Sequence, residues 1–244
     1  MTDRERGETI QRMKGMTTGG HGAVFPIRRD DLSVIGYLRT IDRSILEDCE
    51  LIETMALNRT KHRKNFLTQF DVTPENKKNW LENGVLNNPN KVLFLVEAAD
   101  GTVVGQDGFT MLGGGVFSLD GTMRWMKVGE KDLYVRSGVA RAGICFSFLD
   151  CGISTTEVFE DNIANVKNSI RMGHEIVEVS PLFLSEKNEV FRYDRIPDVS
   201  RSNTDRRLIC FEMKRAVFVV LHGAIYKKNN AERERFDFNH GSGK

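Results

Sequence analysis

The stretch that decides the fold reads RSGVARAGICFSFL and spans residues 136–149. From 139 to 149 it is apolar on nearly every side, which predicts a helix buried against a sheet. Gly152 follows and is expected to end this helix, and residues 153–159 are rich in β-branched side chains, which favours a strand. This alternation of helix and strand is typical of an α/β fold.

A hairpin and a third strand are expected upstream. Residues 92–98 and 102–111 flank Asp100-Gly101, a dipeptide typical of a tight turn between paired strands. The third strand is expected over 122–128. The glycine-rich run at 112–115 follows a strand, but no helical pattern comes after it, so a flexible connection is favoured over a phosphate-binding loop.

Two helices are expected before the hairpin. Asp42 and Ser44 can cap a helix whose apolar side chains, between 45 and 56, follow the i, i+3, i+4 rule. Thr73 and Pro74 open a second helix, which should end near residue 86.

Downstream of the buried helix, Asn162 precedes another helix that stops at Gly173. The patterns of residues 174–184 and 208–213 predict the last two strands, one over each range.

The two ends of the chain lack the pattern of a core. Residues 1–24 are polar and show no sustained periodicity, and residues 223–244 end in a Gly-Ser segment. We expect a mobile tail at each end and one folded domain over 25–222.

Composition excludes several classes of protein. The 244 residues are 40% hydrophobic and 28% charged, with a formal net charge of +1, which gives no electrostatic basis for binding nucleic acid. No apolar run reaches the roughly 18 residues of a membrane span, and no signal-peptide stretch precedes the first strand. The four cysteines match no metal pair, and Cys145 and Cys151, which lie in an apolar stretch, are expected to be buried, free thiols. We therefore expect a cytoplasmic protein with no metal and no membrane partner.

The start of the buried helix is a candidate anion site. Backbone N–H groups in a first helical turn have no intrahelical partner and carry the positive end of the helix dipole. Gly138 and Ala140 would let a pyrophosphate approach the backbone, and Arg136 or Arg141 could add charge-assisted bonds. Taken alone, such a turn is more often a packing feature.

The residues around this turn resemble the GNAT superfamily of acyl-CoA-dependent N-acetyltransferases. Residues 138–142 (GVARA) are similar to its acetyl-CoA pyrophosphate loop, Q/R-x-x-G-x-G/A. Residues 157–162 (EVFEDN), with Gly173 eleven residues later, resemble the strand, asparagine and helix that follow the loop. Further pieces at 38–39, 58–59, 80–81 and 94–105 resemble the branch that contains ribosomal-protein and amino-sugar acetyltransferases.

The resemblance, which covers roughly 37–184, implies a fold and a set of cofactor contacts. The fold is a GNAT-like mixed, mostly antiparallel sheet, splayed in the middle to admit pantetheine, with helices on both faces. The CoA pyrophosphate is held by the backbone of Ser137, Gly138, Val139, Ala140 and Arg141. The pantetheine arm pairs with the strand around Met126, Lys127 and Val128, which also polarises the thioester carbonyl. Asn162 hydrogen-bonds the cofactor or the neighbouring loop.

Three positions depart from the family pattern. Val135 stands at the Gln/Arg position, with Arg136 one place late, which puts side-chain help to phosphate in doubt. Ser169 stands where many members carry the tyrosine that protonates the leaving thiolate, and His174 replaces a phenylalanine. Tyr134 and Tyr193 are possible substitutes for the missing acid.

The implied reaction needs an oxyanion donor and a base that removes the amine proton, often through water. The base candidates are Asp107, Glu97, Glu130 and His174. Each has a structural alternative: Asp107 can shape a bulge, Glu97 can face solvent from a strand, and Glu130 can lie on a loop. Ser137 is not a hydrolase nucleophile, because the G-x-S-x-G pattern is absent.

The implied function is transfer of an acetyl or other acyl group from CoA to a small-molecule amine. An amino sugar, which could be nucleotide-linked, is favoured as acceptor because residues 186–207 are rich in arginine. These arginines are Arg192, Arg195, Arg201, Arg206 and Arg207. A protein N-terminal or side-chain amine is the second candidate, and a CoA-binding module without activity is the third. The sequence leaves the acceptor, the acyl chain length and the oligomeric state open.

Overall fold

The computed structural model describes residues 1–16 and 20–241. They form two compact units, each built from separate stretches of chain. The first unit comprises residues 1–42, 89–154 and 213–244, and the second comprises 43–88 and 155–212. The expected single domain over 25–222 stays a prediction.

The first unit contains an antiparallel sheet. Its strands, in spatial order, are β1 (Val24–Arg28), β2 (Val34–Thr40), β4 (Lys91–Ala98), β5 (Val103–Gly113) and β6 (Val116–Arg124). Strands β4 and β5 form the predicted hairpin. Strand β6 runs earlier than the expected 122–128, because the short turn Gly113–Gly115, all three at positive φ, returns the chain at once. The α/β class and the mostly antiparallel sheet are confirmed, and the opening of the sheet stays a prediction.

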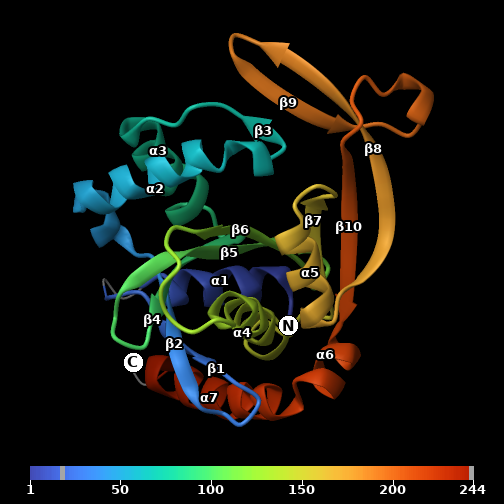
Figure 1. The fold of residues 1–244 in the computed structure, drawn as a ribbon. Coiled ribbons are helices and arrows are strands. Elements are labelled where there is room, and N and C mark those ends of the chain that lie inside the picture. The colour runs from blue at the N-terminus through green and yellow to red at the C-terminus, as the bar shows by residue number, and fades with distance from the viewer. Residues whose placement is uncertain (17–19, 242–244) are drawn as a thin grey trace. The chain divides into compact units, whose positions relative to one another are not determined.

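Helix α4 (Leu133–Ser147) lies against this sheet and contacts α7 (Gly223–Gly241), as Figure 1 shows. Its apolar face is fully covered: Ala142 and Cys145 have no exposed area, and Phe146 is 1% exposed. A row of phenylalanine rings, each within 6.5 Å of the next, joins this helix to the strands and to α6 (Arg215–Leu221). The rings are those of Phe25, Phe94, Phe109, Phe117, Phe146 and Phe218. The predicted buried helix is confirmed, although it begins six residues before residue 139.

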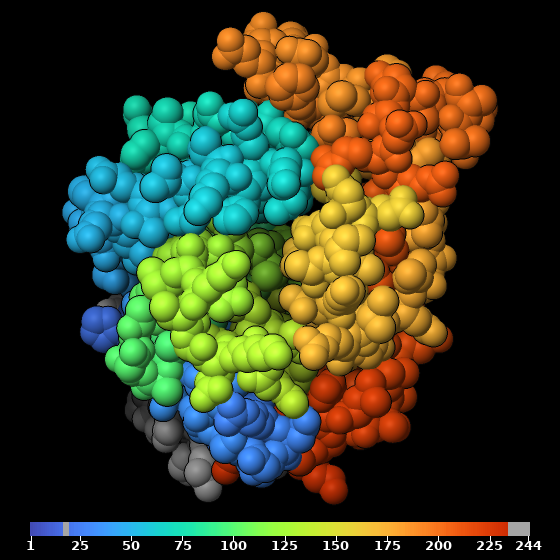
Figure 2. All heavy atoms as spheres, in the orientation of Figure 1, coloured from blue at the N-terminus to red at the C-terminus, as the bar shows by residue number. Residues whose placement is uncertain are grey.

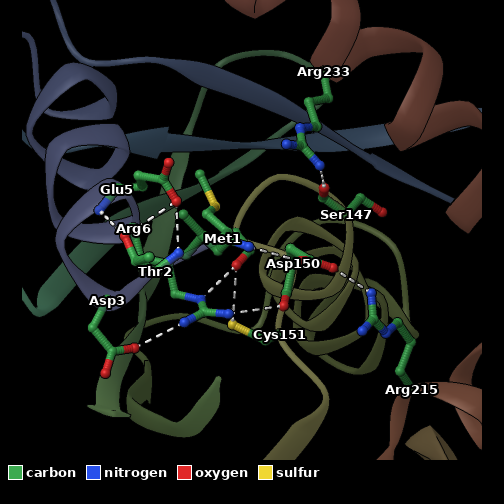
Figure 3. A network of polar contacts seen from close by, with 11 residues as sticks. Met1, Thr2, Asp3, Glu5, Arg6, Ser147, Asp150, Cys151, Arg215 and Arg233 are labelled. Atoms are coloured by element: carbon green, nitrogen blue, oxygen red, sulfur yellow. Dashed lines mark hydrogen bonds and ion pairs between the residues drawn. The ribbon is translucent and has the colours of Figure 1, made fainter. Parts of the chain in front are cut away.

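The N-terminal residues form a docked helix, α1 (Asp3–Met13), so the expected tail is wrong. Thr2 and Glu5 form a capping box, and Ile10 and Met13 have no exposed area. Arg6 donates to the carbonyls of Leu149 (2.8 Å) and Asp150 (3.2 Å), which ties α1 to the turn after α4. Figure 3 shows this arginine within the surrounding network.

The C-terminal residues are also helical. Helix α7 buries Ile225 and Asn229, which are 3% and 9% exposed. The expected C-terminal tail is therefore wrong for residues 223–241, and residues 242–244 lie outside the described part of the chain.

The second unit has its own helices and strands. Strand β7 (Ile153–Phe159) leads into it, β10 (Arg207–Lys214) leads out, and β10, β8 (Glu175–Lys187), β9 (Val190–Arg195) and β3 (Thr68–Gln69) pair antiparallel in that order. Its α-helices are α2 (Cys49–Lys61), α3 (Pro74–Trp80) and α5 (Ile163–Met172). Its 3-10 turns are η1 (Arg43–Glu47), η2 (Arg63–Asn65) and η4 (Val199–Arg201), and η3 (Leu81–Leu86) continues α3 as a π-helix.

Local signals explain the ends of these helices. Thr73 caps α3 as predicted, and Gly173 ends α5 in the left-handed conformation, at φ 99°. The cap of α2 is Asp48, whose carboxylate accepts the Leu51 N–H at 2.9 Å, and the expected caps Asp42 and Ser44 are wrong. The chain passes through η1 first, so the α-helix starts one turn later than the apolar pattern indicated.

Two expected features of composition bear on the fold. All four cysteines are free, and Cys145 and Cys151 are buried, in agreement with the prediction. Cys210 is buried as well, and Cys49 is exposed. Within residues 1–16 and 20–241, no helix has the length and apolar character that a membrane crossing requires.

Docking of α1 predicts a large effect of a core substitution near the N-terminus. We expect Ile10→Ala to lower the free energy of unfolding by about 2–5 kcal/mol, because it leaves a cavity under α1. Glu8→Ala on the exposed side of the same helix should change it by less than about 0.5 kcal/mol. Urea denaturation measures both. Equal effects of the two substitutions would show that α1 does not belong to the core.

Candidate functional site

Strand β6 carries a bulge in the middle of the first unit. Gln106 of β5 pairs with Met123, and Gly108 pairs with Asp120, so Asp107 alone faces the two residues Gly121 and Thr122. Gly121 has φ 69°, a conformation that glycine adopts without strain. A bulge bends its strand and changes the direction in which the following residues point.

A buried ion pair lies behind this bulge. The Asp107 carboxylate has no exposed area, pairs with the Arg141 guanidinium at 3.0 Å and accepts the Ser137 hydroxyl at 2.6 Å. Burial raises the pKa of Asp107, and Arg141, Ser137 and Thr122 oppose that rise. The carboxylate is enclosed by protein and cannot reach a substrate amine in this conformation. These contacts favour the structural alternative for Asp107, and its expected role as base stays a prediction.

Arg141 connects α4 to the neighbouring strands β5 and β6. It donates to the carbonyls of Gly108 and Asp120, the latter at 3.1 Å, and to the Thr122 hydroxyl at 3.1 Å. The side chain of Gln106 donates to the Gly121 carbonyl at 3.0 Å. The acceptors on both sides of the bulge are thus occupied by side chains.

The residues after β6 form an exposed segment that leads into α4. The Trp125 and Met126 N–H groups still donate to the Val104 carbonyl, at 2.9 and 3.4 Å, and the chain then leaves the sheet. Met126 and Val128 are 41% and 43% exposed. Figure 2 shows this part of the chain, in lime green, at the surface.

The five residues expected to hold the pyrophosphate lie inside α4 and are buried: Ser137, Gly138, Val139, Ala140 and Arg141. Because α4 begins at Leu133, their N–H groups belong to the body of the helix. The assignment of the pyrophosphate to these five residues therefore stays a prediction, and their position inside the helix does not favour it. The first-turn N–H groups belong to residues 133–135, which the sequence pattern did not indicate because Gly138 was interpreted as a turn.

Arg136 lies at the end of this first turn and is held by acids. It binds both oxygens of Asp30, at 2.6 and 2.7 Å, and Asp132 at 3.5 Å. The hydrogen bonds from Arg136 lower the pKa of Asp30. A phosphate at Arg136 would have to displace Asp30.

The other base candidates have different surroundings. Glu97 pairs with Arg39 at 2.5 Å, and its side chain is 14% exposed. Glu130 pairs with Arg29 at 2.9 Å and is 52% exposed, in the segment after β6. Both belong to the first unit, whereas His174 is a buried residue of the second unit.

The remaining candidates of the second unit lie on α5. Asn162 is its N-cap residue and makes no side-chain cap bond. Ser169 is 7% exposed, and its carbonyl accepts the His174 N–H at 3.1 Å.

Neither candidate substitute for the acid is at an open site. Tyr134 is half-buried at the start of α4, where its hydroxyl donates to the Val104 carbonyl at 2.8 Å. Burial raises its pKa. Tyr193 packs edge-on against Phe159, at 5.2 Å between the ring centres.

The bulge residues Asp120, Gly121 and Thr122 were missed. An Asp-Gly pair inside a strand pattern is a known signal for a bulge or turn and could have indicated them. The partnership of Asp107 with Arg141, 34 positions later, has no local signal. Among residues 1–16 and 20–233, whose side chains the structure describes, no group of three or more His, Cys, Asp or Glu side chains is placed to hold a metal ion.

Among the comparisons with known proteins, those with solved structures identify the fold, and those with sequences do not. The sequence matches no protein-family profile. No curated protein matches it either.

Three solved structures illustrate the likeness. A probable GNAT-family acetyltransferase from Chromobacterium violaceum superposes with a TM-score of 0.57 at 12% identity, over 82% of this chain and 90% of that chain. Apo FdhC, a nucleotide-linked sugar GNAT, gives 0.56 at 16% identity, over 83% and 98%. Mutant forms of the spermidine/spermine N-acetyltransferase SpeG from Vibrio cholerae give 0.52 at 12% identity, over 75% and 96%. At these identities the likeness establishes the fold, which is that of the GNAT acetyltransferases.

Proposed function

We propose that this protein transfers an acyl group, most simply acetyl, from CoA to an amine. The observation that carries the proposal is the GNAT fold together with the bulged strand β6, which continues into the exposed segment 125–132 and the first turn of α4. In the reaction, the neutral amine forms a C–N bond with the thioester carbonyl, and the C–S bond breaks. The thiolate leaves and takes a proton from water, while a base accepts the amine proton.

The proposed cofactor contacts lie in the segment after β6 and in the first turn of α4. We assign the pantetheine arm to Met126, Lys127 and Val128, because two of these side chains leave apolar surface exposed beside backbone that has departed from the sheet. We assign the pyrophosphate to the N–H groups of the first turn of α4. Arg136 would contribute only after releasing Asp30.

The general base is proposed to be Glu130 or Glu97. Glu130 is the more exposed of the two, and it lies in the same segment as the proposed pantetheine contacts. His174 remains a candidate from the second unit. With serine at position 169, no tyrosine acid is needed, because a thiol with a pKa of about 8.5 is a good leaving group near neutral pH.

The acceptor is proposed to be an amino sugar, with a nucleotide-linked amino sugar as the specific form. One relative in fold, FdhC, is a nucleotide-linked sugar GNAT, and SpeG acts on spermidine and spermine. Three of the arginines on which this preference depends already form ion pairs with acids of the second unit. Arg192 pairs with Asp194 at 2.8 Å, Arg206 pairs with Asp161 at 2.7 Å, and Arg195 pairs with Glu157.

Two arginines of that set keep their charge available. In the part of the chain that the structure describes, Arg201 and Arg207 are exposed and have no ion pair. The preference for a phosphorylated acceptor therefore rests on these two. A protein amine is the alternative acceptor, and a CoA-binding module without turnover is the non-enzymatic alternative.

Binding of acetyl-CoA tests the proposal. At about 100 times its dissociation constant, acetyl-CoA should add about 2.7 kcal/mol to the free energy of unfolding, which corresponds to about 5–10 °C in Tm. Met126→Glu combined with Val128→Glu should abolish this shift without unfolding the protein, because both side chains are exposed. Leu112→Glu, at another exposed apolar position of the first unit, is the control and should keep the shift. An unchanged Tm of the unaltered protein at saturating acetyl-CoA would contradict the proposal.

The acceptor is tested by comparing amines with and without phosphate. We expect Arg201→Ala with Arg207→Ala to raise KM for a nucleotide-linked amino sugar at least tenfold and to leave KM for the free amino sugar unchanged. Arg192→Ala removes an arginine that is already paired and should change neither value. The rate of thiol release from acetyl-CoA, followed at varied amine concentration, measures each of these KM values. If the unaltered protein prefers the free amine or a peptide amine, the phosphorylated acceptor is wrong.

A further inference from the structure

The buried pair of Arg141 and Asp107 has contacts that simple core stability does not require. A buried ion pair is weak evidence for stability, because removing two charges from water costs about as much as their attraction returns. Well-packed apolar side chains fill such positions at least as stably, and the surrounding core of the first unit is largely apolar. The contacts of the two charged side chains show which parts of the backbone they hold in place.

Arg141 holds both sides of the bulge at once. Its guanidinium reaches the Gly108 carbonyl on β5, and the Asp120 carbonyl and Thr122 hydroxyl on β6. Gly108 and Asp120 form the last regular pair before the bulge, and Thr122 lies within it. An arginine fork has fixed geometry, so these three contacts define one position for the bulged backbone.

Asp107 in turn fixes the position of the fork. Its carboxylate accepts the Ser137 hydroxyl from α4 and pairs with Arg141 from the next turn of the same helix. Both partners are at most 4% exposed at the side chain, so water does not compete for these bonds. The helix, the straight strand and the bulged strand are thereby joined through one buried carboxylate.

We propose that Arg141, held by Asp107, is a positioning residue that sets the bulge of β6 so that the backbone after it polarises the thioester carbonyl of bound acyl-CoA. The inference rests on the proposed function, because it concerns the backbone that contacts the thioester there. Arg141 touches no substrate. It acts by fixing where β6 bends, since the direction of the strand beyond Thr122 depends on the bulge.

The test observes the thioester carbonyl directly, with acetyl-CoA labelled with ¹³C at that carbon. Binding to the unaltered protein should move the carbonyl resonance downfield. Arg141→Lys keeps the charge and loses the fork, and it should bind acetyl-CoA within a few-fold of the original Kd while its carbonyl resonance stays near that of free acetyl-CoA. The double variant Asp107→Asn with Arg141→Met removes both charges, should melt close to the unaltered protein, and should also lose the shift.

A matched control separates positioning from stability. Arg6→Lys changes another buried arginine that binds backbone carbonyls of the first unit, far in sequence from the bulge. It should lower Tm and keep the full carbonyl shift.

The outcomes distinguish the inference from the proposed function. If the unaltered protein does not bind acetyl-CoA, the proposed function fails and the inference falls with it. If it binds with a shift that Arg141→Lys and the double variant retain, the inference alone is overturned. Folded variants that lose binding altogether, or an unaltered protein that binds with no shift, would also overturn the inference.

Discussion

The ion pair between Arg141 and Asp107 is the constraint on which the geometry of the β6 bulge depends. Arg141 comes from α4 and Asp107 from β5, and the two side chains meet only when the chain folds. Their side chains are 4% and 0% exposed, so water barely reaches the pair. Because an unpaired charge in this position would cost several kcal/mol, α4, β5 and β6 must assemble together. The phenylalanine row beside it supplies the apolar burial that offsets this cost.

Much of the fold follows from local patterns, and the reasons for the failures are physical. The hairpin of β4 and β5, the strand β7 and the end of α5 at Gly173 depend on alternation and turn chemistry within a few residues. The start of α4 was missed because Gly138 lowers helix propensity by about 1 kcal/mol, a cost that burial of the surrounding helix exceeds. Helix α1 has few apolar residues, and its capping box at Thr2 and Glu5 was the signal available.

The candidate site was less accessible to sequence reasoning than the fold. Asp107 was one of the base candidates for the implied reaction, but its partner Arg141 lies far along the chain. The pyrophosphate assignment moved by one helical turn when the boundary of α4 moved. The exposed residues Met126 and Val128 remain where the resemblance indicated a cofactor contact, although they follow the strand instead of belonging to it.

The central claim is that CoA is held by the chain between the β6 bulge and the first turn of α4. Amide hydrogen exchange followed by mass spectrometry, with and without CoA, locates bound ligand by the peptides that it protects. The account predicts slower exchange in peptides that cover residues 121–135, and little change in peptides from α1 or α7 of the same unit. Protection confined to other parts of the chain, with residues 121–135 unaffected, would contradict it.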